Sequence, residues 1–294
     1  MRNHLKYNVV GAIGLLLLGL PGRAQQQHAA TGLLLKVDSA HKTLVISCRD
    51  IPGYMEAMVM PFAVQDARAL DELKPGMILD FDLIDRNGAA YANNIHVRAF
   101  QSLELDPTQA KRLRGVEDAL APSGSKGVPI GERVPDFTLL DQNGRSVRLS
   151  QFNGKVVALT FLYTRCPFPN YCVRLSNNFA RLQKRFHDQM GHELVLLSIV
   201  IDAVHDQPKT LEKYATMWKA DPSAWHFLTG SADELQQVCR HFEMNYYPDE
   251  ALYIHSFHTA VIDQQGKLAA NLEGNEFTAQ QLGDFVESVI RNPK

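Results

Sequence analysis

The chain has 294 residues, of which 45% are hydrophobic and 21% are charged, and its formal net charge at pH 7 is -2. This length is sufficient for two modest domains, each with its own hydrophobic core. The near-neutral charge and the lack of a basic stripe argue against a nucleic-acid-binding protein.

The N-terminus, residues 1–24, has the pattern of a secretory signal peptide. A basic start at Arg2 is followed by an apolar run, Val9–Leu20, and by Ala24 at the expected cleavage position. The apolar run is shorter than the ~20 residues that span a bilayer. We therefore expect a cleaved signal, a periplasmic protein and no stable membrane insertion. An uncleaved signal is the alternative, and it would leave the protein associated with the membrane.

Residues 28–100 are predicted to form a small all-β domain. Strand-like runs occupy Gly32–Val37 and Lys42–Ser47, and apolar and acidic residues alternate over residues 79–83. Asn87-Gly88 is typical of a hairpin turn before a returning strand. About five short strands in this length indicate a barrel of OB type.

Residues 101–127 are predicted to form a linker between two domains. A short helix is expected over Asp106–Leu120, and the segment Pro122–Gly127 is rich in serine and glycine. Such a composition is typical of a flexible tether.

Residues 128–294 alternate predicted strands and helices. The apolar runs Val156–Tyr163 and Leu194–Ile201 are typical of buried central strands. Helices are expected from apolar residues at helical spacing, and Ser231 and Thr278 have the capping-box pattern of helix starts. This order predicts an α/β sandwich.

Two cysteines, Cys166 and Cys172, lie where the first buried strand ends and a helix begins. Such corners are where α/β proteins place ligands. A helix N-terminus also favours the thiolate over the thiol. Two thiolates on one loop suit a soft cation such as Cu(I).

This domain resembles the Sco (SenC-type) copper proteins. The matching stretches are Pro135–Leu139, Phe161–Pro167, Ser198–Asp202, Trp225–Gly230 and His255–Ser256. The resemblance implies a thioredoxin-like fold and copper held by Cys166, Cys172 and His255. The commonest Sco spacing has three residues between the cysteines, whereas five separate them here, as in the longer loop of a bacterial subgroup.

Other interpretations of the same cysteines stay open. Cys166 and Cys172 can instead be a structural disulfide, or the redox-active catalytic pair of a thiol-disulfide oxidoreductase. The spacing is not Cys-x-x-Cys, and the chain has no proline between Pro248 and Pro293, where thioredoxin-like reductases carry a cis-proline. His258 is a substitute for His255 as a ligand. Two further side chains are expected to have structural roles: Asp202, at a strand end, and Cys239, on an apolar helix face.

The N-terminal domain carries a second soft-metal pattern. Met58 and Met60 are two apart, so on a strand they point to the same face, and thioether sulfur suits Cu(I). Residues 30–98 resemble the periplasmic copper-binding barrels of CusF type, which use a Met-x-Met pair, a histidine and an aromatic side chain. Cys48 occupies the histidine position, and Met55 stands near the aromatic one. The alternative is that the methionines simply fill the barrel core.

Together these patterns predict an α/β thioredoxin-like C-terminal domain fused to a small all-β N-terminal domain, with copper as the cofactor, bound as Cu(I) or, alternatively, as Cu(II). The expected function is an exported copper chaperone, a metallochaperone rather than an enzyme. The resemblance implies a cytochrome oxidase subunit, or another periplasmic copper enzyme, as the copper acceptor. Two alternatives remain: a thiol-disulfide oxidoreductase acting on copper-acceptor cysteines, and a copper sequestration protein serving tolerance.

Overall fold

The computed structural model describes residues 27–86, 88–98, 127–249 and 252–292. The predicted signal peptide, Asn87 of the predicted turn, and the predicted helix over residues 106–120 lie outside the described residues, as does nearly all of the predicted linker. None of the helices that the structure describes is long and apolar enough to cross a membrane.

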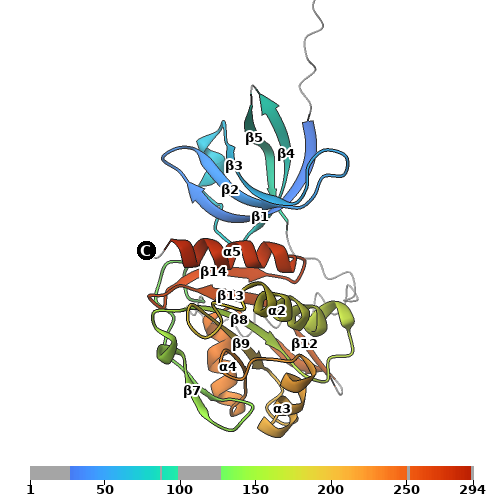
Figure 1. Ribbon diagram of the computed structural model, residues 1–294, viewed down its shortest axis with the longest axis vertical. Coiled ribbons are helices and arrows are strands. Elements are labelled where there is room, and N and C mark those ends of the chain that lie inside the picture. Colours follow the sequence, from blue (N-terminus) through green and yellow to red (C-terminus); the bar gives the residue numbers. More distant parts are fainter. Residues whose placement is uncertain (1–26, 87, 99–126, 250–251, 293–294) are drawn as a thin grey trace, which may run out of the picture.

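The first domain is a closed five-stranded barrel with the strand order β1-β2-β3-β5-β4 (Figure 1). Its elements are β1 (Gln27–Asp38), β2 (Thr43–Cys48), β3 (Met58–Ala63), the 3-10 helix η1 (Ala67–Leu70), β4 (Ile78–Arg86) and β5 (Ala89–Val97). Leu79, Phe81 and Leu83 alternate with polar residues along β4 and are buried in the barrel core. The prediction of a small all-β domain is therefore confirmed.

The second domain alternates strands and helices. Its first elements are β6 (Thr138–Leu140), β7 (Ser146–Arg148), the 3-10 helix η2 (Leu149–Phe152), β8 (Val156–Leu162), the single-turn helix η3 (Pro169–Val173), α2 (Arg174–Arg185) and β9 (Leu194–Val200). It continues with α3 (Pro208–Met217), β10 (Trp225–Leu228), α4 (Ala232–His241), β11 (Tyr246–Asp249), β12 (Leu252–His255), β13 (His258–Ile262), β14 (Leu268–Glu273) and α5 (Ala279–Arg291).

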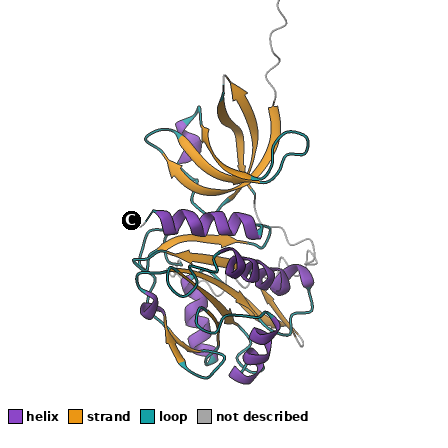
Figure 2. Cartoon of the chain, viewed as in Figure 1, coloured by secondary structure: helices purple, strands orange, loops and turns teal. Residues whose placement is uncertain are grey.

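The central sheet has the order β10-β9-β8-β13-β14. β8, β9 and β10 run parallel, and β13 is antiparallel to both β8 and β14. This order and these directions are those of a thioredoxin-like fold, as predicted. Figure 2 contrasts the strands of the barrel with the second domain, in which helices surround the sheet.

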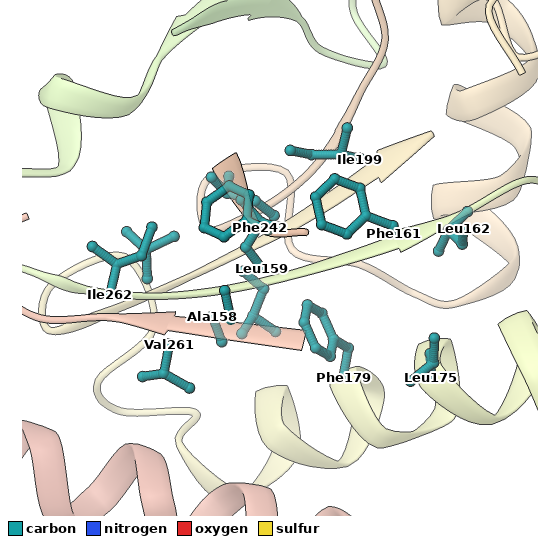
Figure 3. Close-up of a cluster of buried hydrophobic side chains, with 14 of the residues drawn as sticks. Ala158, Leu159, Phe161, Leu162, Leu175, Phe179, Ile199, Phe242, Val261 and Ile262 are labelled. Atoms are coloured by element: carbon teal, nitrogen blue, oxygen red, sulfur yellow. The ribbon is translucent and has the colours of Figure 1, made fainter. Parts of the chain in front are cut away.

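The core of the second domain is built on β8, which is buried along its whole length. Phe161 and Phe242 lie on one side of this strand, and Leu175 and Phe179 of α2 lie on the other (Figure 3). Because both faces of β8 are covered, its sequence is a continuous apolar run. The carboxyl end of this strand carries the loop with Cys166.

The barrel packs against α5 and β14 of the second domain (Figure 1). Leu33, Leu35 and Ile78 of the barrel are buried in the same apolar cluster as the core of the second domain. The two domains therefore share a continuous hydrophobic contact.

Candidate metal centre

The two cysteines lie on the loop that leaves the carboxyl end of β8. Cys166 is half-buried, and Cys172 is buried inside η3. Tyr171, inside η3, has non-helical dihedral angles (φ -108°, ψ -109°), so the turn is kinked directly before Cys172. The sequence prediction that the cysteines stand between a central strand and a helix is therefore correct.

His255, at the end of β12, reaches the same place from a distant part of the chain. Its Nε2 atom lies 4.0 Å from the Sγ atom of Cys172. Its Nδ1 atom lies 2.7 Å from the carbonyl oxygen of Ser256. Because a carbonyl oxygen only accepts hydrogen bonds, Nδ1 carries the proton and the lone pair of Nε2 faces Cys172. Metal-binding histidines are held in this way by a hydrogen bond from their other nitrogen.

Burial sets the charge of this histidine. The imidazole of His255 is buried, and burial lowers its pKa to about 4. The ring is therefore neutral at pH 7, and a metal ion does not compete with a proton for Nε2.

The two thiols differ strongly in acidity. A hydrogen bond from the Cys172 thiol to the Cys166 sulfur is the main cause that lowers the pKa of Cys166 to about 6. Burial raises the pKa of Cys172 well above the ordinary thiol value. At pH 7 the pair therefore consists of a Cys166 thiolate and a Cys172 thiol. Thiolate is the form of cysteine that binds metals and attacks disulfides.

Tyr163 belongs to this site, although the sequence analysis assigned it no role. Its hydroxyl group hydrogen-bonds the Cys166 sulfur and lies 3.4 Å from the carbonyl oxygen of Tyr253. Its ring meets the His255 ring edge-on, with centroids 5.8 Å apart. Burial raises the pKa of Tyr163, so its hydroxyl stays protonated and donates to one of these acceptors at a time. The sequence signal for this role was an aromatic residue placed directly after a buried strand.

The base of the loop is anchored by buried carboxylates. Arg165 Nη2 lies 2.6 Å from Asp202 Oδ2, and the Thr164 amide donates to Asp206 at 3.0 Å. Both aspartates are buried. Asp202 therefore positions the residues that precede Cys166 and is engaged with Arg165, which fits the structural role expected for it.

The donor set is chemically suited to a soft metal ion. With bonds of about 2.3 Å to thiolate and about 2.0 Å to imidazole, two ligands of one metal lie about 3.5–3.8 Å apart in tetrahedral or trigonal geometry. The sulfur-to-nitrogen distance of 4.0 Å between Cys172 and His255 is close to this range. Among the described residues, no group of three His, Cys, Asp or Glu side chains is already arranged as a metal site. The three side chains thus gather at one place without forming a preorganised ligand set, and their role as ligands stays a prediction.

Two other residues named from the sequence are buried and have surroundings of their own. His258 is buried, and its Nδ1 atom lies 3.3 Å from Asn271 Oδ1. Burial lowers its pKa to about 4. Cys239 is buried on the inner face of α4, where burial raises the pKa of its thiol.

The barrel brings the second set of sulfur atoms to one face. Cys48 pairs with Met58, and Ile46 pairs with Met60, across β2 and β3. Directly opposite residues project to the same side of a sheet, and here that side is the barrel interior. Cys48 is buried and Met58 is 45% exposed, so the group extends from the core to the surface. Burial raises the pKa of Cys48 to about 12, which keeps its thiol protonated.

His28 is a second residue that the sequence reasoning missed. Its ring stacks on Tyr54 with centroids 3.7 Å apart and an interplanar angle of 18°. The Nε2 atom of His28 is buried and has no hydrogen-bond partner. Met55 packs against the barrel core nearby in sequence. Tyr54, the aromatic residue next to Met55, is therefore stacked on a histidine of β1. The sequence signal for His28 was its position on the inward-facing side of β1.

Comparisons with known proteins agree with both halves of this description. The SCO1/SenC family model matches residues 130–291, and the model described as "Copper binding periplasmic protein CusF" matches residues 27–96. The second description confirms the prediction of copper as the metal.

Two curated relatives match part of the chain. The chain is 29% identical over 110 residues to "SCO1 protein homolog" of Bacillus subtilis, and 25% identical over 166 residues to "Protein sco1" of Schizosaccharomyces pombe. These matches cover 37% and 54% of this chain and 55% and 61% of the two relatives, so the chain spans little more than half of their lengths.

Among solved structures, Arabidopsis thaliana ScoI with copper bound is 24% identical and has a TM-score of 0.48; the match covers 54% of this chain and 99% of that chain. The SCO1/SenC match extends over more than half of the sequence and includes Cys166, Cys172 and His255. This chain belongs to the SCO1/SenC family.

Proposed function

We propose that this protein is an exported copper chaperone that takes up Cu(I) and passes it to a periplasmic copper enzyme. The observation that carries the proposal is the meeting of Cys172 and His255, whose Nε2 lone pair faces the sulfur at 4.0 Å. Cys166 adds a thiolate at neutral pH because its pKa lies at about 6. Two sulfurs and one neutral imidazole form a donor set that suits Cu(I).

Copper is the cargo, and transfer proceeds by exchange of ligands. The half-buried Cys166 offers the sulfur that an acceptor protein reaches first, whereas Cys172 and His255 lie deeper. Each bond to the acceptor replaces one bond to the chaperone, so no free ion is released. The proposed acceptor is a cytochrome oxidase subunit, as the family resemblance implies.

The barrel is proposed to hold copper through Met58, Met60 and Cys48. Their common inner face and the partial exposure of Met58 support this assignment. Cys48 replaces an imidazole with a thiol whose proton must leave before it binds metal, because burial raises its pKa to about 12.

The test is an anaerobic titration of the reduced protein with Cu(I) against a competing chelator. We expect two tightly bound coppers per wild-type chain, one in Cys166→Ala/Cys172→Ala and one in Met58→Leu/Met60→Leu. Matched controls are Cys239→Ala and Met217→Leu, because Cys239 is buried on α4, which carries none of the proposed ligands, and Met217 is 70% exposed. A wild type that binds no copper tightly would refute the chaperone function.

Delivery is then separated from storage. Copper-loaded protein is mixed with a copper-free fragment of an oxidase subunit, and copper is counted in each after their separation. Movement of copper to the fragment in the presence of a chelator that traps free ions supports delivery. Retention of all copper on the chain indicates sequestration instead.

A second candidate function, thiol-disulfide exchange, is favoured by the unequal acidity of the two thiols. The Cys166 thiolate would attack a substrate disulfide, form a mixed disulfide and release one substrate thiolate. Cys172 would then attack Cys166, close the Cys166–Cys172 disulfide and release the second substrate thiol, so that two electrons pass to the substrate. Turnover with a disulfide substrate that survives His255→Ala would favour this function, because His255 matters for metal binding and not for the exchange.

A further inference from the structure

The contact between the barrel and the second domain is apolar and tight. Leu33 is fully buried in it, in a row with Ser47 and Ile78 on the outer face of the barrel. At Gly76 an added Cβ atom would lie 3.0 Å from Cβ of Ala270 on β14, so the two domains leave no room there for a side chain. An apolar contact of this kind favours a fixed orientation over free domain motion.

A short segment, Asn275–Gln281, contacts the cysteine loop on one side. This segment, called here the bridge, joins β14 to the first turn of α5. Asn275 Nδ2 donates to the carbonyl oxygen of Asn170 at 2.6 Å. Arg174 Nη2 donates to the carbonyl oxygen of Glu276 at 3.1 Å. Asn170 lies between the two cysteines, and Arg174 lies two residues after Cys172.

The same bridge contacts the sulfur-bearing edge of the barrel. Arg49 Nη2 donates to the Glu276 carbonyl oxygen at 2.7 Å, so Arg49 and Arg174 share one acceptor. Gln281 Nε2 donates to the carbonyl oxygen of Ser47 at 3.0 Å in a buried position. Ser47 and Arg49 flank Cys48 directly.

Further contacts hold this edge along α5. Gln280 Nε2 donates to the carbonyl oxygen of Ala57, the residue before Met58, at 3.3 Å. Ser47 Oγ donates to Asp284 at 2.7 Å, and the Arg98 guanidinium lies 3.7 Å from the Glu276 carboxylate. The neighbours of Cys48, Met58 and Cys172 are thus all held by one continuous stretch of chain.

We infer that the barrel works as a docked copper donor. The bridge, rather than the length of the linker, fixes the position of the barrel's sulfur site relative to the cysteine loop of the same chain. The inference rests on the proposed function, because it concerns transfer between the two proposed copper sites. A tethered donor would instead depend on its linker, since the effective concentration of two linked sites falls with linker length.

The undocking variant is Leu33→Lys. It places a charge in the apolar contact, whereas in a free barrel the same side chain lies on the surface and disturbs no core residue. Ala29→Lys is the matched control, because Ala29 is an exposed residue of the same strand. Small-angle X-ray scattering of the full chain is expected to give the same radius of gyration for wild type and Ala29→Lys, and a larger one for Leu33→Lys. An unchanged radius in Leu33→Lys would overturn docking through this contact.

Transfer is measured in the same proteins. The barrel is loaded with one equivalent of Cu(I) while Cys166 and Cys172 are held as a disulfide, and a phosphine reductant starts the reaction. Samples are quenched with an alkylating reagent, and the protection of Cys166 by bound copper reports the arrival of the metal. The copper-free protein gives the rate of reduction alone, which transfer cannot exceed.

Linker length then distinguishes a docked donor from a tethered one. Doubling the predicted linker with glycine and serine is expected to leave the transfer rate of wild type unchanged. In the Leu33→Lys background the same insertion is expected to slow transfer about threefold, the fall for a flexible tether of twice the length. A threefold fall in wild type would overturn the inference. A count of tightly bound copper separates the two ways in which the experiment can fail. A wild type that binds no copper tightly refutes the proposed function. A wild type that binds copper tightly but transfers it at a rate that depends on linker length refutes docking alone.

Discussion

The low pKa of Cys166 has one largest cause among several hydrogen bonds, and a substitution at Cys172 tests that cause directly. The hydrogen bond from Cys172 is the largest cause that lowers the pKa of Cys166 to about 6, and burial acts in the opposite direction. Cys172→Ala removes the donor and leaves the burial. The midpoint of the Cys166 titration is therefore expected to move from about 6 toward the ordinary thiol value of 9.0. Cys172→Ser retains a donating hydroxyl group and is expected to keep the midpoint near the wild-type value.

The size of the effect depends on what is measured. At pH 7 a thiol with a pKa near 6 is about nine-tenths thiolate, and one with a pKa near 9 is about one-hundredth thiolate. A more basic thiolate is also a better nucleophile, with a Brønsted coefficient of about 0.4–0.5, so the two effects largely offset one another. Even a full return of the pKa to 9.0 would lower the alkylation rate at pH 7 only about three- to sixfold, so the upward movement of the titration midpoint is the more sensitive measurement.

The assay is therefore a full pH profile of iodoacetamide alkylation between pH 4 and 10, followed at Cys166 by peptide mass spectrometry. Cys48 and Cys239 are internal references, because both are buried and burial raises the pKa of each. If Cys172→Ala left the midpoint near 6, the hydrogen bond from the Cys172 thiol would not be the main cause of the low pKa of Cys166, and the assignment of that cause would be refuted.

Three further predictions follow from burial and charge. Met58→Leu/Met60→Leu is expected to change the free energy of unfolding in urea by less than about 1.5 kcal/mol per site, since leucine retains the apolar volume, while one tightly bound copper is lost; a variant that still binds two coppers would show that the methionines only fill the core. Phe179→Ala, at a fully buried position, is expected to lower the free energy of unfolding by about 3–5 kcal/mol in the same assay, and a loss below 1 kcal/mol would contradict the central packing role of α2. The copper affinity of the Cys166–Cys172 site, measured by chelator competition, is expected to rise about tenfold per pH unit above pH 6, because only Cys172 must release a proton there. Below pH 6 it is expected to rise about a hundredfold per unit, because Cys166 is protonated too. Equal slopes on both sides of pH 6 would show that the two thiols titrate alike.

The sequence predicted those elements whose signals are local. Ser231 and Thr278 accept hydrogen bonds from the third residue of α4 and α5, as their capping-box pattern indicates. The predicted run Val156–Tyr163 became β8 because a strand buried on both faces needs apolar residues throughout. The barrel strands were found for a related reason, since alternation along β4 separates its inner from its outer face.

Other features depend on contacts between distant residues. β10 has four residues, and its parallel pairing with β9 has no local signature in the sequence. Cys172 and His255 are 83 residues apart, so only the family resemblance brought them together in advance. The contacts of the bridge with Ser47 and Arg49 span more than 220 residues, and nothing in the local sequence marks them.

The two proposed sites differ in what oxidation does to them. A Cys166–Cys172 disulfide would remove both thiolates of the second domain, and metal binding there requires thiolates. The thioethers of Met58 and Met60 form no disulfide, and Cys48 is buried with a pKa raised to about 12, which keeps it from reacting as a thiolate. The barrel would thus keep its sulfur donors while the cysteine pair is oxidised, and reduction of the pair would open the second site to copper. The bridge keeps the barrel docked on the second domain. Copper that the barrel holds while the cysteine pair is oxidised therefore stays on the same chain as Cys166 and Cys172, which become ligands again when they are reduced.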